Sequence, residues 1–492
     1  MKITKSKRIY IIGAGYAGRG IAADIAQRGT AGRVVAFLDD DKQKIGTKID
    51  EFPVLGPIAD VENHLLNNPA DEAIIAIPGA SREAIERVHT LLLEADFDRI
   101  RILPRLSEIV ETSPRLIQTR EIDPQDFLGR EPVAISLKKS LVYLRGKRVL
   151  ITGAGGSIGS ELARQLLSGG AQRLYLFDHE ENSLYEIEKD LRILQNAGVG
   201  EAATVVPVVG DLKDKDYMDF IIRRLKADVI FHCAAYKHVP MLEANPIEAI
   251  KNNVFGTKNL VDAAKKHEVS RFVLISTDKA VDPICVYGAS KMIAEELVLH
   301  ASNGSSQFMV VRFGNVLESR GSITPLLRKQ INSGGPVTIT DPKAARFFMT
   351  LPESASLVLK AGGVGEGGNL YILDMGEPIV IRELAEQMIR FYGYLPGNEI
   401  PIEYIGLRPG EKVVENLWSS DEEPVKTPFS RINRLIRKPR FNGELSEILE
   451  ELRPACYFEE SKPEAYRNRR ELRTHIRRHI PTVRTPDEEP EY

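Results

Sequence analysis

The chain has 492 residues, 43% of them hydrophobic, and its 66 basic and 69 acidic residues leave a net charge of −3, which gives no electrostatic footprint for nucleic acid. At about 150 residues per domain, this length predicts roughly two to four domains. Cys233, Cys285 and Cys456 lack zinc-ligand and disulfide spacing, and no window reaches the about 18 consecutive apolar residues of a membrane span, so we expect a cytoplasmic protein with no metal site and no span in this chain.

Residues 1–104 read as a small doubly wound α/β domain. A buried strand (RIYIIG) leads into three glycines in GxGxxG spacing and then a helix. The next strand ends in an acidic pair, where a ribose-binding carboxylate would lie. A candidate second nucleotide site therefore comprises Gly13, Gly15, Gly18 and Asp39. The alternative is a fold that serves assembly or regulation.

A second Rossmann pattern begins after residues 105–146, whose prolines, charges and isolated apolar residues predict an ordered linker. The strand KRVLIT precedes glycines in TGxxGxxG spacing and a helix. Glycines let the backbone approach a pyrophosphate, and the helix N-terminus offers unpaired N–H groups. The expected phosphate-binding residues are Gly153, Gly156, Ser157, Ile158 and Gly159.

The following strand, RLYLFD, ends at Asp178, 19 residues after Gly159. A carboxylate at this spacing suits a ribose 2′-hydroxyl and would repel a 2′-phosphate, which predicts NAD rather than NADP.

Later strand ends supply further expected contacts. Asp211 and Leu212 follow the third strand, where an adenine would lie, and the small residues Ala234 and Ala235 follow the fourth, where they allow close passage of a cofactor. Beyond them, Lys237 and His238 are candidate substrate contacts, although a lone loop histidine is more often only solvated. Two asparagines inside the next helix, at positions 252 and 253, suggest a structural hydrogen bond under the active site.

The stretch LISTDKAVDPICVYGASK carries the expected chemistry. An apolar strand leads to the polar cluster Thr277, Asp278 and Lys279, and a helix then carries Tyr287 and Lys291. Tyrosine and lysine four positions apart share a helix face. A cation beside the phenol favours the phenolate and lowers the pKa of the tyrosine, so the pair predicts a general base for a hydroxyl group.

TGxxGxxG, the STDKA cluster and YxxxK together resemble an extended short-chain dehydrogenase/reductase. The strings STDKAVDP, YGASK, VRFGNVLESRGSITPLL, RFFMTLPES, LDMGEP and GLRPGEK resemble the nucleotide-sugar 4,6-dehydratases of polysaccharide biosynthesis, most closely the UDP-N-acetylglucosamine 4,6-dehydratases. The N-terminal domain resembles the Rossmann-like module of the long, membrane-anchored members. The resemblance implies an α/β fold of two Rossmann-like doubly wound parallel-sheet domains, the second with a smaller substrate-binding C-terminal part.

By this resemblance, Tyr287 removes the proton of the sugar's 4-hydroxyl as NAD takes the hydride from carbon 4, and Lys291 holds the nicotinamide ribose. Thr277 takes the usual serine or threonine position beside them. Asp278 would protonate the departing 6-hydroxyl, and Lys279 would be the base at carbon 5. A neighbouring ammonium ordinarily keeps a carboxylate ionised, so these last two roles require a desolvated site and coupled titration.

The resemblance also implies a UDP-sugar substrate. Asn315 would contact it, Arg408 would hold its diphosphate, and Glu411 its ribose. The dehydratase domain would span 147–430 and act as a homo-oligomer. Residues 431–492 form a charged extension, whose arginine-rich run predicts a solvated or subunit-contacting helix.

The chain departs from the long members in three places. It contains no run of membrane helices, it has Tyr287 where they often have methionine, and it has Glu318 where glycine is usual, which would crowd the sugar pocket. Two alternatives stay open. A UDP-sugar 4-epimerase needs NAD, Tyr287 and Lys291 but not the Asp278–Lys279 pair, and a non-enzymatic NAD-sensing regulator of polysaccharide assembly needs only the cofactor site.

Overall fold

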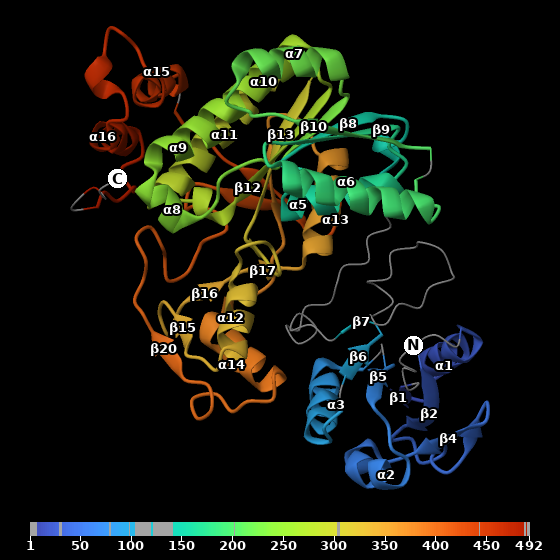
Figure 1. Cartoon of the computed structure of the whole chain (residues 1–492). Coiled ribbons are helices and arrows are strands. Elements are labelled where there is room, and N and C mark those ends of the chain that lie inside the picture. The colour runs from blue at the N-terminus through green and yellow to red at the C-terminus, as the bar shows by residue number, and fades with distance from the viewer. Residues whose placement is uncertain are drawn as a thin grey trace. The chain divides into compact units, whose positions relative to one another are not determined.

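The computed structural model of the chain describes residues 7–28, 32–77, 80–97, 99–103, 120–121, 141–200, 202–302, 306–441, 443–486 and 489 (Figure 1). Most of the expected linker 105–146 lies outside the described residues. The chain forms two compact units. The first comprises 1–134, 330–337 and 384–402, and the second comprises the remaining residues.

The first unit is built on a seven-stranded sheet in the order β3-β4-β2-β1-β5-β6-β7, parallel except for β3 and β7. Alternate residues of β1 enter two cores. Tyr10 and Ile12 pack with residues of α3, whereas Ile9 and Ile11 pack with residues of α1. Its strands are Arg8–Ile12 (β1), Arg33–Leu38 (β2), Lys48–Ile49 (β3), Phe52–Leu55 (β4), Glu72–Ile75 (β5), Arg99–Ile102 (β6) and Arg120–Glu121 (β7). Its helices include Tyr16–Arg28 (α1), Val61–Asn67 (α2) and Arg82–Glu94 (α3).

The second unit is built on a nine-stranded sheet in the order β10-β9-β8-β11-β12-β13-β18-β22-β21, in which only the last two strands run antiparallel to their neighbours. This is the Rossmann strand order with three added strands. The strands are Arg148–Thr152 (β8), Arg173–Asp178 (β9), Thr204–Val209 (β10), Val229–His232 (β11), Arg271–Thr277 (β12), Gln307–Phe313 (β13), Leu370–Leu373 (β18), Glu423–Lys426 (β21) and Ile432–Ile436 (β22). Two Rossmann-like parallel sheets confirm the predicted fold class.

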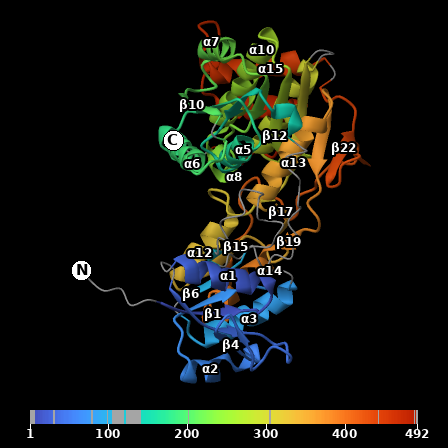
Figure 2. The ribbon, with the colours of Figure 1, turned by 90° about the vertical axis from the view of Figure 1, so that its right-hand side faces the viewer.

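Helices cover both faces of this sheet. Val149 and Ile151 of β8 enter the core shared with α5, α6 and α13, while Leu150 between them enters the core shared with α7, α10 and α11. The helices α7 and α10 pack side by side (Figure 2). The helices are Ser157–Ser168 (α5), Glu181–Asn196 (α6), Lys215–Leu225 (α7), Val239–Ala244 (α8), Pro246–Ile250 (α9), Thr257–Lys266 (α10), Val286–Ala301 (α11) and Leu351–Val364 (α13).

Short strands and helices between β13 and β21 form the smaller part that the resemblance implies, although residues 330–337 and 384–402 of it are grouped with the first unit. Three two-stranded sheets, β14-β17, β15-β20 and β16-β19, hold it together. Its elements are Asn315–Val316 (β14), Ile323–Asn332 (α12), Val337–Ile339 (β15), Ala345–Arg346 (β16), Phe348–Met349 (β17), Ile379–Val380 (β19), Ile381–Phe391 (α14) and Ile402–Tyr404 (β20).

The C-terminal extension packs onto its own chain. Helices Leu445–Cys456 (α15) and Arg469–His479 (α16) share a core with α8, α9 and α11. Arg473, only 1% exposed, donates to Glu243 Oε2 at 2.9 Å. The arginine-rich helix is therefore half buried within the unit, because its leucine and isoleucine positions and Arg473 face inward, whereas the sequence predicts a solvated or subunit-contacting helix.

Within the described residues, no helix combines the length and apolar character needed to cross a bilayer.

Candidate active site

The turn after β8 brings the backbone closer to its neighbours than a side chain would allow. Gly153 has a φ of +69°, and a Cβ there would lie 2.6 Å from the amide nitrogen of Ala234. A Cβ on Gly159, in the first turn of α5, would lie 2.2 Å from the carbonyl oxygen of Gly153. Glycine at both positions therefore permits the close strand-to-helix packing of a dinucleotide-binding turn.

This turn forms one wall of a cavity of about 220 Å³ at the carboxyl ends of β8, β9 and β11. The predicted cofactor residues that line it are Gly153, Gly156, Asp178, Asp211, Leu212, Ala234 and Ala235. The predicted residues Ser157, Ile158 and Gly159 lie in α5, and Tyr287 and Lys291 lie in α11, without lining it.

Asn252, one of the two asparagines expected under the active site, also lines the cavity. The lining residues that were not predicted from the sequence are Gly155, Phe177, His179, Glu180, Ser183, Gly210, Cys233, Tyr236 and Arg320. Most of them adjoin the predicted strand ends, so their positions carried a signal. Arg320 carried none, because it reaches the cavity from a loop far along the chain.

Asp178 organises the turn as well as lining the cavity. Its Oδ2 accepts a hydrogen bond from the amide of Gly155 at 2.9 Å, and its Oδ1 accepts one from the amide of Glu180 at 3.1 Å. A Cβ on Gly155 would lie 3.2 Å from the same carboxylate. The ring nitrogen Nδ1 of His179 also lies 3.3 Å from Oδ1 of Asp178.

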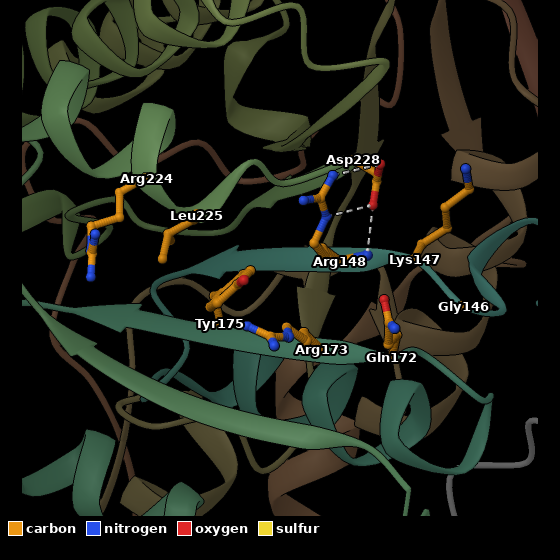
Figure 3. A pocket seen from close by; sticks show the side chains of 9 residues that line it. All are labelled: Gly146, Lys147, Arg148, Gln172, Arg173, Tyr175, Arg224, Leu225 and Asp228. Carbon is orange, nitrogen blue, oxygen red and sulfur yellow. Dashed lines mark hydrogen bonds and ion pairs between the residues drawn. The ribbon is translucent and has the colours of Figure 1, made fainter.

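A separate pocket of about 470 Å³ lies at the opposite edge of the same sheet (Figure 3). Its lining includes the first residues of β8 and β9, Arg148 and Arg173, and Arg148 is paired with Asp228 at 3.3 Å. None of the predicted site residues lines this pocket, so the candidate chemistry lies at the carboxyl edge.

The catalytic candidates meet where β12 ends. Thr277 caps the 3₁₀ turn Asp278–Ala280: its hydroxyl accepts from the amide of Lys279 at 3.3 Å and donates to Asp278 Oδ1 at 2.9 Å. Lys279 Nζ lies 3.0 Å from the same oxygen. Asp278 is fully buried, and its Oδ2 has no hydrogen-bond partner among the described residues, which leaves this oxygen available to a reacting group.

Tyr287 and Lys291 lie on α11 as the spacing predicts, but their surroundings differ from the expectation. Burial raises the pKa of Tyr287 to about 12, while the charge of Lys279 and a hydrogen bond with Thr277 act in the opposite direction. Lys291 instead donates to the carbonyl of Ile275 at 2.8 Å, and burial lowers its pKa to about 8. The cation that favours the phenolate here is therefore Lys279.

Lys279 stands among three oxygen-bearing side chains. Besides Asp278, its Nζ donates to Asn315 Oδ1 at 3.2 Å and lies 3.8 Å from Glu415 Oε1. Burial alone would lower the pKa of Lys279, but the carboxylates of Asp278 and Glu415 together hold it above the usual value. The structure thus brings predicted Asn315 to predicted Lys279, and it adds Glu415, which no local pattern in the sequence indicated.

The remaining substrate candidates are less closely gathered. Partial desolvation, with Lys279 nearby, lowers the pKa of Lys237. The ring of His238 packs on Gly321, where a Cβ would lie 2.3 Å from Cε1. Arg408 is exposed, and its amide donates to Glu411 Oε2 at 3.2 Å, so the two form one turn.

The RPGEK turn is anchored by residues that the sequence analysis did not single out. The guanidinium of Arg346 donates to the carbonyl oxygens of Lys412 and Val413, both at 2.8 Å. Lys412 donates to the carbonyl of Val281 at 2.8 Å and lies 3.6 Å from Glu415.

The asparagine pair makes the structural hydrogen bonds that the sequence suggests. It lies in a π-helical segment, Lys251–Gly256. Asn253 accepts from the amide of Tyr236 at 2.9 Å and donates to its carbonyl and to Ser290 Oγ, both at 3.0 Å. It therefore ties the chain after β11 to α11, which carries Tyr287 and Lys291.

In the first unit, Gly13 has a φ of +103°, and a Cβ on Gly18 would lie 2.0 Å from the carbonyl oxygen of Gly13. A Cβ on Gly15 would meet nothing within 4 Å. Asp39 accepts from the amide of Ala14 at 2.7 Å and pairs with Lys44 at 3.2 Å. The predicted residues form a glycine turn whose aspartate is engaged by the protein itself.

Glu318 adopts a φ of +54°, the left-handed region that favours glycine. Its side chain pairs with Arg328 at 3.0 Å.

Among the residues that the structure describes, no cluster of histidine, cysteine, aspartate or glutamate could hold a metal ion.

The fold and the glycine turn define an extended short-chain dehydrogenase/reductase. Residues 149–437 match the family model described as polysaccharide biosynthesis protein, and residues 8–82 match the PglD N-terminal domain. The chain belongs to the polysaccharide biosynthesis protein family.

Individual relatives agree with this assignment. The chain is 38% identical over 430 residues to the probable polysaccharide biosynthesis protein EpsC of Bacillus subtilis, covering 87% of this chain and 71% of that protein. It is 33% identical to a UDP-N-acetylglucosamine 4,6-dehydratase (inverting) of Campylobacter jejuni, over 58% of this chain and 80% of that one. It is 34% identical to a UDP-glucose 4-epimerase of Rickettsia rickettsii, over 56% and 79%. The X-ray structure of Pen from Bacillus thuringiensis superposes with a TM-score of 0.54 at 33% identity, covering 61% of this chain and 88% of that one.

Proposed function

We propose that the protein is an NAD-dependent nucleotide-sugar 4,6-dehydratase whose substrate is a UDP-amino sugar, with UDP-N-acetylglucosamine as the first candidate. The observation that carries this proposal is the contact of 3.0 Å between fully buried Asp278 and partly buried Lys279, beside the hydroxyls of Thr277 and Tyr287. Elimination of water across carbons 5 and 6 needs a base at carbon 5 and an acid at the 6-hydroxyl. Epimerisation at carbon 4 needs neither of these two groups.

The residues present fit NAD. Gly153 and Gly156 would face its diphosphate, and Asp178 would face its ribose. A carboxylate beside the ribose disfavours the 2′-phosphate of NADP, so NAD is the better fit. NAD bound in this cavity would accept a hydride from carbon 4 and return it to carbon 6.

The protein's own groups then move protons. Tyr287 takes the proton of the 4-hydroxyl. Transfer of the Lys279 proton to Asp278 across their 3.0 Å contact prepares the acid and the base together. Lys279 takes the carbon 5 proton, and Asp278 protonates the 6-hydroxyl, which leaves as water. When the double bond is reduced, Lys279 returns its proton to carbon 5.

Over the cycle Tyr287 gains one proton and the Asp278–Lys279 pair loses one. Thr277 lies beside Tyr287 and donates to Asp278 at 2.9 Å, so its hydroxyl offers a route by which Tyr287 returns that proton. The cytoplasmic location and the homo-oligomer remain predictions.

The test is incubation with UDP-N-acetylglucosamine followed by mass spectrometry of the product. A dehydratase gives a loss of about 18 Da, one water. A product of unchanged mass would favour the second candidate, a 4-epimerase, which the similarity to the Rickettsia relative supports. Bound NAD without turnover or UDP-sugar binding would indicate the regulator.

A further inference from the structure

The segment that begins with β14 reaches the dinucleotide cavity. Asn315 at its start contacts Lys279, and Arg320 farther along lines the cavity together with the glycine turn. The amide of Arg320 donates to Ser157 Oγ, in the first turn of α5, at 3.0 Å. One short segment therefore joins the catalytic cluster to the phosphate-binding helix.

The guanidinium of Arg320 continues across to α6. It donates to Ser183 Oγ and, at 2.9 Å, to Glu186 Oε2. Ser183 Oγ in turn donates to Glu180 Oε2, which also lines the cavity. The Glu186 contact is largely exposed and contributes little, so the contacts with Ser157 and Ser183 hold the segment in place.

The charges lining the cavity give this arginine a second task. Asp178, Glu180 and Asp211 place three carboxylates in the lining, and Arg320 is the one lysine or arginine among the described lining residues. A dinucleotide adds a negatively charged diphosphate. A guanidinium fork is well suited to phosphate oxygens, and here it borders the turn where a diphosphate would lie.

The segment is also braced from the other side. Gly321 has a φ of +70°, and the ring of His238 packs directly on it. A side chain at 321 would displace the ring or the loop, so His238 and Gly321 fix the approach of Arg320 to the cavity.

We propose that Arg320 retains the dinucleotide: its segment closes the cavity between α5 and α6, and its guanidinium compensates the diphosphate charge. This inference rests on the proposed cofactor, not on the sugar chemistry. Retention suits a reaction in which the hydride returns to the substrate, because the cofactor need not leave between turnovers.

The test measures NAD itself. Wild type and Arg320→Gln are purified and loaded with NAD, and the retained dinucleotide is quantified by chromatography after denaturation, together with its release rate on dilution. We expect at least about tenfold faster release from Arg320→Gln, the scale of one charge-assisted hydrogen bond. Raising the salt concentration should accelerate NAD release from the wild type more than release from Arg320→Gln, because salt screens the attraction between the arginine and the diphosphate.

Two matched variants sharpen the result. Glu186→Gln removes only the exposed contact and should retain NAD as the wild type does, whereas Gly321→Ala should release it faster by displacing the loop. Equal release from the wild type and Arg320→Gln, at equal thermal stability, would overturn the proposal. If Arg320→Gln releases NAD faster as expected but the wild type does not convert the sugar nucleotide, this proposal stands and the dehydratase is refuted. If the wild type binds no NAD at all, both the cofactor site and this proposal are refuted.

Discussion

The two units repeat one local design and use it differently. Each has a parallel strand, a glycine turn, a helix and a second strand that leads to an aspartate, and each aspartate accepts a backbone amide of its own turn: Asp39 from Ala14 at 2.7 Å, Asp178 from Gly155 at 2.9 Å. Asp39 then pairs with Lys44, whereas Asp178, with the ring of His179 at 3.3 Å, lines a cavity.

The difference comes from residues far from the shared motif. Ala234, Asp211 and Arg320, which complete the cavity around Asp178, come from later strands and loops of the second unit. A glycine motif thus specifies a turn, and the rest of the domain decides whether the turn holds a ligand.

The largest expected effect comes from removing chemistry that belongs to the second unit alone. Asp278→Asn should lower dehydration by about 10²- to 10⁴-fold, because the amide cannot protonate the departing hydroxyl. Oxidation at carbon 4 should continue, so quenching with borodeuteride should reveal a labelled sugar that keeps its 6-hydroxyl by mass spectrometry. Asp39→Asn serves as control and should dehydrate normally. Undiminished product from Asp278→Asn would place the acid elsewhere.

Alanine in the two glycine turns should separate folding from binding. A Cβ on Gly159 would lie 2.2 Å from the Gly153 carbonyl oxygen, and one on Gly18 would lie 2.0 Å from that of Gly13. Each variant should lose about 1–3 kcal/mol of stability in its own unit through overpacking. Only Gly159→Ala should also lose bound NAD, measured by chromatography. Loss of NAD from Gly18→Ala alone would reverse the assignment of the two units.

The two aspartates give a smaller, sharper contrast. Asp178→Asn should weaken NAD binding by about tenfold and narrow the preference for NAD over NADP, because the charge beside the ribose is removed. Asp39→Asn should leave both affinities unchanged and cost its unit roughly 1 kcal/mol through the weakened Ala14 and Lys44 contacts. Calorimetric titration of both variants with NAD and with NADP measures these affinities. If Asp178→Asn binds both dinucleotides as Asp39→Asn does, Asp178 has only a structural role.

The last expected effect is a pH dependence of stability. Burial lowers the pKa of Lys291 to about 8 from 10.5, so between these values the unfolded chain binds more protons and folding becomes more favourable as pH rises. Relative to Lys291→Met, the wild type should therefore gain stability across this window in denaturant titrations.

Lys44→Met is the matched control for that pH dependence. Its partners Asp39 and Asp41 raise the pKa of Lys44 against partial desolvation, so the wild type should lose stability relative to this variant as pH rises above the unfolded value. Because Lys44 is partly exposed, this slope should be shallow. The same sign for both lysines would contradict the burial of Lys291.

Local patterns were sufficient for the strands, both glycine turns, Asp178 and the Tyr287–Lys291 spacing, since each depends on residues close in the chain. They were insufficient for the charges around them. The i,i+4 rule placed Lys291 beside Tyr287 on the helix surface, yet the polar end of Lys291 reaches the Ile275 carbonyl, and Lys279 supplies the charge.

Contacts between residues far apart in the sequence were not predictable, because local patterns report only on residues close in the chain. Glu415 reaches Lys279 and Arg320 reaches Ser157 only after distant loops have folded, and although Arg320 lies in the string VRFGNVLESRGSITPLL, nothing in that string indicates its contact with Ser157. The expected crowding of the sugar pocket by Glu318 stays a prediction. Its left-handed backbone explains why glycine suits this position, while its side chain pairs with Arg328.

Asn315 and Arg320 lie on one segment, with Lys279 at one end and Ser157 at the other. Two sites that share such a segment are thermodynamically linked. If a sugar nucleotide orders the segment from the Asn315 end and so tightens binding of the dinucleotide, the dinucleotide must tighten binding of the sugar nucleotide by the same factor. The loop would then set an order of events in which the empty protein is filled once and afterwards exchanges only sugars.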